Sequence, residues 1–138
     1  MGVSHTVLTL LDDPAFEPWL RQHGIVLPQP WPAHRYPSPA EIRAVLDPLP
    51  GYVVEYSVGP GRWDARIATA DRQRTAIWVR NFSGDAMAPH EFFFHKGSEA
   101  LNMQILEQLA PICGPLVLVS DAAGLPMVVF GPGQVLYG

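Results

Sequence analysis

The chain has 138 residues, of which 48% are apolar, and this is enough to form one sizeable core. Only 16% of the residues are charged, which excludes a chain kept disordered by excess charge. The net charge of −4 argues against a nucleic-acid-binding protein that relies on a broad positive field. No apolar run approaches the roughly 18 to 20 residues of a membrane-spanning helix. We therefore expect one soluble domain over residues 1–138, with neither nucleic acid nor a membrane as partner.

The cysteine content and the N-terminal residues bear on the cellular compartment. Cys113 is the single cysteine, so no internal disulfide can form, and a reducing compartment is the simplest interpretation. The N-terminus has no basic stretch, and its apolar run from Val7 to Leu11 is too short for a secretory signal. We therefore expect a cytoplasmic protein.

The first elements expected in chain order are a helix and a proline-rich connector. The helix is expected to start at Asp13, or at Glu17 if the nearby prolines delay it, and to end before Gly24. From Pro28 to Pro39 the repeated prolines exclude both a helix and a central strand. This segment is therefore predicted to be a stiff connector.

A second helix is expected directly after the connector. Ser38 and Glu41 have the spacing of a capping box, and Pro39 suits the first helical position. Prolines at positions 48 and 50 predict its end. Apolar residues recur at helical spacing at Ile42, Val45, Leu46 and Leu49.

From residue 52 the apolar residues recur with a period of two, which predicts β-strands. Two strands, Tyr52–Val58 and Arg62–Ile67, flank a Gly-Pro-Gly turn and are predicted to form a hairpin. Further strands are expected at 75–82 and 91–95, each after a polar break. Four consecutive strands with short turns predict an antiparallel meander.

The C-terminal part predicts a third helix and a second hairpin. The helix is expected to begin at Ser98, and Pro111 and Gly114-Pro115 are expected to end it, because proline lacks the N–H that continues a helix and glycine suits a C-terminal cap. Apolar runs at 116–120 and 127–130 predict the hairpin, and whether 131–138 adds a strand is left open. The predicted fold class is α+β, an antiparallel sheet (four-strand meander plus C-terminal hairpin) packed on helices in the order ααββββαββ.

The strand alternation divides the meander into an apolar face toward the helices and an outer face. The outer face carries positively and negatively charged side chains together with the aromatic rings of Trp78 and Phe93. It also includes Glu55 and Ser57. Trp and Arg carry much of the binding energy at protein interfaces, so this face is predicted to bind a protein partner. An exposed sheet face with charges paired across strands is the alternative interpretation. The predicted binding residues are Arg62, Asp64, Arg66, Trp78, Arg80, Glu91, Phe93 and His95.

The sequence lacks the patterns that carry catalytic or metal chemistry. His90 and His95 point to opposite faces of a strand, so they are not expected to hold a metal ion. Neighbouring arginines would keep the carboxylates of Glu55, Asp64 and Glu91 ionised, whereas a general acid needs a raised pKa. Cys113 ends a helix, where the dipole disfavours a thiolate, and is expected to be a buried structural residue. We expect no cofactor, no metal and no catalytic residues.

The C-terminal half carries a resemblance to a protein family. Small single-domain α+β immunity proteins of bacterial toxin systems are what this half resembles, on the run from Phe92 to Gly97, the helix after it to Leu109, the run from Cys113 to Leu118, Asp121 and Val128-Val129. The resemblance implies a cytoplasmic protein that binds one cognate toxin and blocks it without catalysis.

The leading hypothesis is a non-enzymatic protein-binding module, an immunity protein in the sense of that resemblance, present as a monomer or a homodimer. One alternative is a chaperone or adaptor for a secreted partner. In that case this protein would form a homodimer through its apolar edge from Leu116 to Phe130. Another is a small-molecule-binding protein or small enzyme with a pocket between sheet and helices, drawing on Tyr56, Trp63 and His95.

Overall fold

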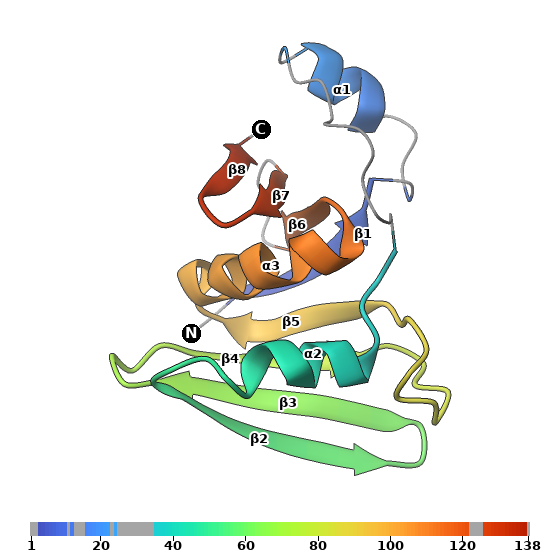
Figure 1. Cartoon of the computed structure of the whole chain (residues 1–138), viewed down its shortest axis with the longest axis vertical. Helices are drawn as coiled ribbons and strands as arrows, with labels where there is room; N and C mark the ends of the chain where they lie inside the picture. The colour runs from blue at the N-terminus through green and yellow to red at the C-terminus, as the bar shows by residue number, and fades with distance from the viewer. Residues whose placement is uncertain are drawn as a thin grey trace.

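A computed structural model describes residues 3–10, 12, 16–22, 24, 35–121 and 126–137. These residues form one antiparallel sheet of eight strands, in the order β2-β3-β4-β5-β1-β6-β7-β8, together with helices (Figure 1). None of the described helices is long and apolar enough to cross a bilayer. The elements are β1 (Val3–Thr9), α1 (Phe16–Gln22), α2 (Pro39–Leu46), β2 (Tyr52–Gly59), β3 (Arg62–Thr69), β4 (Arg74–Val79), β5 (Phe92–Gly97), α3 (Glu99–Cys113), β6 (Leu116–Ser120), β7 (Met127–Gly131) and β8 (Gln134–Tyr137).

The α+β class and the antiparallel sheet are confirmed, but the predicted element order is wrong. The sequence prediction omitted β1, which lies in the middle of the sheet and pairs with both β5 and β6. Its inward side chains include polar His5 and Thr9 beside Val7, and all are buried, so the apolar alternation that marks a strand is missing. The meander and the C-terminal hairpin are thus joined by β1 into a single sheet, which β8 extends at the end.

The meander β2–β5 has the predicted pairing and the predicted faces. Tyr56 lies opposite Ala65 and Ile77 lies opposite Phe94, so these residues share the inner face. Ala65, Ile77 and Phe94 are fully buried there. The alternation therefore predicted the faces correctly, because one face of these strands is covered and the other is open.

The second helix begins with the predicted capping box. The Ser38 hydroxyl accepts the Glu41 backbone N–H at 3.1 Å, and the Glu41 carboxylate accepts the Ser38 N–H at 3.0 Å. Arg35 donates to both Glu41 carboxylate oxygens, at 2.6 and 2.8 Å. This bidentate pairing with Arg35 is the main reason that the pKa of Glu41 falls to about 2. The start of α2 is thereby clamped to the segment before it.

The third helix begins as predicted, at the Ser98 cap, and of its two predicted end signals it passes Pro111 and stops at Gly114. Pro111 lies within the last turn, and the helix continues to Cys113. Gly114 ends it with φ +85°, a left-handed value that favours glycine, and its N–H donates to the Ala110 carbonyl at 2.8 Å. The glycine cap, rather than the proline, sets the end of the helix.

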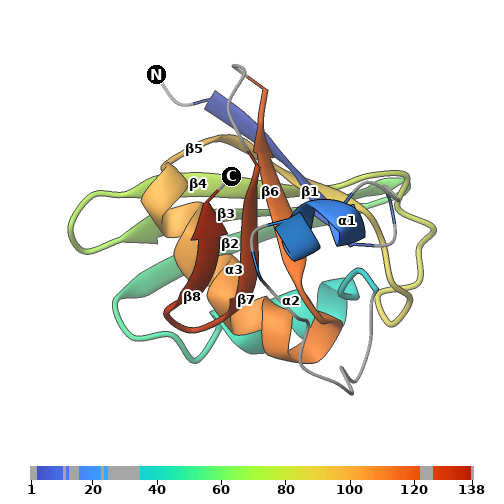
Figure 2. The ribbon, with the colours of Figure 1, turned by 90° about the horizontal axis from the view of Figure 1, so that it is seen from above.

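The two faces of the sheet are covered differently. On the inner face α2 and α3 pack on the strands and form the main core, which includes Ile42, Phe92 and Leu106. On the outer face α1 contributes Leu20 to a smaller cluster with Val117 of β6 and other residues. Figure 2, seen from above, shows α1 beside β6 and β1. Among the described residues, no helix covers the outer face of β2–β5.

Some predictions fall on residues outside the described ranges. These are the Asp13 start of the first helix, the connector up to residue 34, and most of the turn at 121–124. The first helix itself is found as α1, and Gly24 follows it with φ +71°, as a glycine near a helix end allows.

Candidate functional site

The outward side chains of β2–β5 form one continuous surface, which we call the open face. Ser57, Asp64, Trp78 and Phe93 lie opposite one another across the four strands. A second row passes from Glu55 through Arg66 to Ala76. The open face consists of Val53, Glu55, Ser57, Arg62, Asp64, Arg66, Ala68, Arg74, Ala76, Trp78, Phe93, His95 and the flanking residues Arg80, Glu91 and Lys96.

An aromatic cluster occupies the middle of the open face. The Trp78 side chain remains 40% exposed although it stacks on the His95 ring, with centroids 4.2 Å apart and an interplanar angle of 22°. Phe93 meets Trp78 edge-on at 5.7 Å, and the Arg80 guanidinium lies 4.5 Å above the Phe93 ring. These contacts hold a large, partly exposed indole in one orientation, so little side-chain entropy is lost when a partner covers it.

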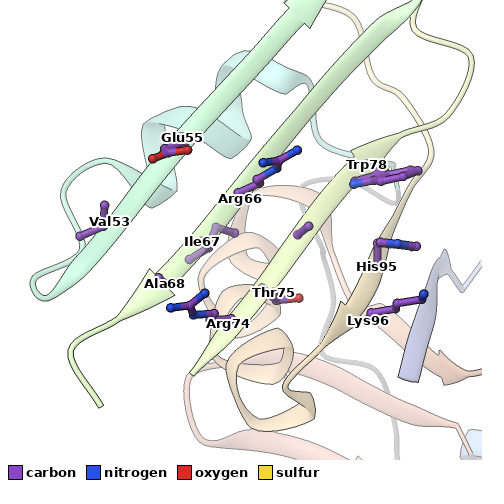
Figure 3. A pocket seen from close by; sticks show the side chains of 11 residues that line it. Val53, Glu55, Arg66, Ile67, Ala68, Arg74, Thr75, Trp78, His95 and Lys96 are labelled. Carbon is purple, nitrogen blue, oxygen red and sulfur yellow. The ribbon is translucent and has the colours of Figure 1, made fainter. Parts of the chain in front are cut away.

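Beside Trp78 the open face forms a depression of about 670 Å³. Figure 3 shows that Glu55, Arg66, Arg74 and His95 come to it from four neighbouring strands. We call it the basic depression. Its lining residues are Val53, Glu55, Arg66, Ile67, Ala68, Arg74, Thr75, Ala76, Trp78, His95 and Lys96.

The cations of the basic depression have no ion-pair partner among the residues that the structure describes. Within the described part of the chain no carboxylate lies within 4.0 Å of Arg66, Arg74 or Lys96. Glu55 is the cross-strand neighbour of Arg66, yet the two side chains form no ion pair at this distance. These positive charges are therefore not neutralised within the face, contrary to the alternative of charges paired across strands.

Lys96 reaches the open face through an irregularity in the sheet. Its φ is +48°, a left-handed conformation that non-glycine residues seldom adopt. The pairing of β1 with β5 shifts register at this point, since Val3 lies opposite Gly97 but His5 lies opposite Phe94. One extra residue in β5 re-aims the side chains at the end of the strand, as β-bulges do.

Asp64 is the buried carboxylate of the open face. Its side chain is only 7% exposed, and Oδ2 accepts a hydrogen bond from Arg62 at 3.1 Å. Oδ1 is buried and has no hydrogen-bond partner among the described residues. Asp64 and Trp78 together line a second depression of about 380 Å³, next to the turn at Gly61. A buried acceptor without a donor costs free energy until a donor reaches it.

The structure places the predicted binding residues as follows. Arg62 and Asp64 form an ion pair, Arg80 contacts Phe93, and Trp78 connects Phe93 with His95. Arg66 joins this group by lining the basic depression. Glu91 lies just before β5, is exposed, and lines neither depression.

Sequence reasoning missed Arg74 and Lys96 as residues of the site. Arg74 is in phase with Trp78 along β4, so extending the alternation by one residue before Thr75 would have found it. Nothing in the local pattern predicts the outward position of Lys96, because strict alternation assigns it to the inner face.

A buried polar network on the inner face was also not predicted. The Thr75 hydroxyl donates to Asn102 Oδ1 at 2.6 Å, and the Asn102 amide donates to His5 Nδ1 at 3.3 Å. His5 Nε2 therefore carries the proton and donates to Glu99 at 3.3 Å. Asn102 is fully buried, and its side chain links α3 to β1 and β4.

The three residues of the alternative small-molecule pocket lie on opposite faces of the sheet. Tyr56 and Trp63 pack on the inner face, with ring centroids 5.6 Å apart, whereas His95 lies on the open face. The proposed pocket of Tyr56, Trp63 and His95 is therefore wrong. No cluster of three His, Cys, Asp or Glu side chains that could hold a metal ion occurs in the described ranges.

His90 and Cys113 have structural environments. His90 Nε2 accepts the Ser83 backbone N–H at 3.1 Å, and its other ring nitrogen lies 2.7 Å from the Ala88 carbonyl. Cys113 is buried as expected, and burial raises its pKa to about 12. Its thiol is therefore protonated at neutral pH and is a poor nucleophile.

Comparisons of the chain with protein families, curated proteins and solved structures found no match.

Proposed function

We propose that the protein is a non-enzymatic module that binds a protein partner through its open face. The observation that carries the proposal is the fixed, partly exposed Trp78, which sits among aromatic rings and arginines on a sheet face that no described helix covers. Rigid aromatic anchors and arginines are the side chains that most often dominate binding energy at protein interfaces. Neutralisation of a toxin is the role that the sequence resemblance adds to this proposal.

The orphan carboxylate oxygen of Asp64 supports a polar partner rather than a purely apolar one. Oδ1 has almost no exposed surface, so a partner's N–H or O–H group can donate to it only if the Asp64 side chain turns toward the second depression. Asp64 and Trp78 line the same depression, so one docking event can cover the indole and supply the donor.

The alternative of a dimer formed through the Leu116–Phe130 edge is not supported by the sheet order. β6 pairs with β1 and β7, and β7 pairs with β8, so neither strand has a free edge. The sheet ends are β2 and β8 instead. Strand-to-strand dimerisation would therefore have to use one of those two.

Affinity capture from the native lysate followed by calorimetry with the purified partner tests the proposed function. The Trp78→Ala variant is expected to weaken binding at least about 30-fold, as loss of an interface anchor does. Met87→Ala is the matched control, because Met87 is 75% exposed and lies outside the open face, and it should bind normally. A retained metabolite without a protein partner, or equal binding by the Trp78→Ala variant, would contradict the proposal.

A further inference from the structure

We infer that the basic depression binds an extended acidic peptide segment of the protein partner. This inference rests on the proposed function and specifies the chemistry of the partner at one subsite. It follows from the charge of the open face, from the placement of its cations on three strands and from the orphan acceptor that Asp64 provides beside them.

The charge of the open face is opposite in sign to that of the whole chain. The face carries five of the nine basic residues and three of the thirteen acidic ones, although the net charge of the protein is −4. Arg62 is paired with Asp64, and Arg80 lies over Phe93, whereas Arg66, Arg74 and Lys96 have no ion-pair partner within the described ranges. An anionic ligand would meet three charges that need no rearrangement of existing ion pairs.

The cations lie diagonally across the strands, because Arg66 is opposite Ala76 and Arg74 is therefore its diagonal neighbour at about 7–8 Å. Arg66, Arg74 and Lys96 belong to β3, β4 and β5, and neighbouring strands lie about 4.8 Å apart. Alternate side chains of an extended peptide are about 7 Å apart and project from the same side. A segment that crosses the strands can therefore present successive carboxylates to cations on different strands. Arginine adds bidentate pairing, which suits the planar carboxylate.

A peptide also provides what Asp64 lacks. The basic depression and the second depression share Trp78, so a segment that lies over the indole reaches both. The backbone N–H groups of an extended segment can donate to the Asp64 carboxylate if its side chain turns toward the second depression. One ligand class thus accounts for the unpaired cations and for the unpaired acceptor.

The same surface is poorly suited to single-stranded nucleic acid. Stacked bases need free ring faces, but one face of Trp78 is covered by His95 and one face of Phe93 by Arg80. The carboxylates of Glu55 and Asp64 lie among the cations and repel phosphate groups. A peptide can direct donors toward these carboxylates, which a phosphate backbone cannot do.

Fluorescence anisotropy with defined probes tests the inference. The probes are a labelled decapeptide of alternating Asp and Thr, its Asn-Thr counterpart, and a decauridylate RNA, all at low salt. The acidic peptide is expected to bind at least about tenfold more tightly than either other probe. The Arg66→Gln Arg74→Gln variant should lose about tenfold of that affinity, and the single variant Lys96→Gln about threefold.

Arg72→Gln is the matched control, because Arg72 is exposed in the turn between β3 and β4 and does not line the basic depression. It removes one positive charge, as Lys96→Gln does, and should change the affinity less than about twofold. Equal binding of the Asn-Thr peptide, tighter binding of the RNA, or an equal loss in Arg72→Gln would overturn the inference. If the partner is lost in Trp78→Ala but bound normally by the Arg66→Gln Arg74→Gln variant, the proposed function stands and this inference fails.

Discussion

The outer side of the sheet has two halves that follow different rules. Over β6 and β7 the outward residues Val117 and Val128 are buried beneath Leu20 of α1. Over β2–β5 the outward positions carry charges and the partly exposed Trp78. The sequences differ accordingly, since β6 and β7 are continuous apolar runs, whereas β2 and β3 alternate. A strand buried on both faces needs no polar residues, and an open face retains groups that water or a partner can satisfy.

The largest expected effect comes from placing a charge in the covered half. Val128→Asp puts a carboxylate at a fully buried position without a partner, and it should lower the free energy of unfolding by roughly 3–5 kcal/mol. Val53→Asp is the matched control in the open half, where the side chain is 65% exposed, and should cost under about 0.5 kcal/mol. Urea unfolding of both variants measures the contrast, and similar losses would mean that the two halves do not differ.

A second comparison is between the two faces of the meander. Trp63 of β3 lies on the inner face and Trp78 of the adjacent strand β4 lies on the open face. Trp63 is 4% exposed in the main core, so Trp63→Ala should destabilise the protein by roughly 3–5 kcal/mol. Trp78→Ala removes a partly exposed ring and its contacts with Phe93 and His95, and about 1 kcal/mol is expected. Thermal unfolding of the two variants compares them. A core-sized loss in Trp78→Ala would show that the faces are assigned the wrong way round.

A smaller effect is expected from the polar network of the inner face. Asn102→Ala leaves the Thr75 hydroxyl and His5 Nδ1 without their buried partner, and should cost about 1–3 kcal/mol. Gln108→Ala, at an exposed position of the same helix, should cost under about 0.5 kcal/mol. If chemical denaturation finds both variants equally stable, the network does not stabilise the packing of α3 on the sheet.

The smallest effect concerns the clamp at the start of α2 and depends on pH. The pKa of Glu41 is depressed from 4.5 to about 2, so the stability that it contributes is present above pH 4.5 and is lost as the pH falls toward 2. About 1 kcal/mol is expected, because Glu41 and Arg35 are both partly exposed and solvent screens the pair. Glu41→Gln should remove this part of the pH dependence. Urea unfolding at pH 5 and pH 2 measures this. If Glu41→Gln loses as much free energy of unfolding between the two pH values as the unmutated protein does, the assignment is contradicted.

The sequence predicted the elements whose signals are local. The capping box at Ser38, the alternation in β2–β5 and the cap at Ser98 each lie within a few residues, and each appears in the structure. β1 was missed because its inward His5 bonds to Glu99 and Asn102, residues more than 90 positions away. Tertiary partners that satisfy a buried polar side chain leave no pattern in the strand itself.

For the candidate site, the alternation placed the predicted residues on one face but did not show which of them touch. The Trp78–His95 stack and the orphan oxygen of Asp64 depend on register and rotamers, which a single sequence does not specify. Lys96 depends on a bulge that reverses its expected side. The contrast between the two halves is therefore readable from the sequence, whereas the geometry of the open face is not.

We propose that the partner binds the open face and not the half covered by α1. The most direct measurement follows the tryptophan indole N–H signals in nuclear magnetic resonance spectra while the captured partner is added, with Trp78→Phe used to assign Trp78. The Trp78 signal is expected to shift strongly, while the signal of the buried Trp63 should move little. A shift confined to Trp19 of α1, with Trp78 unchanged, would contradict it.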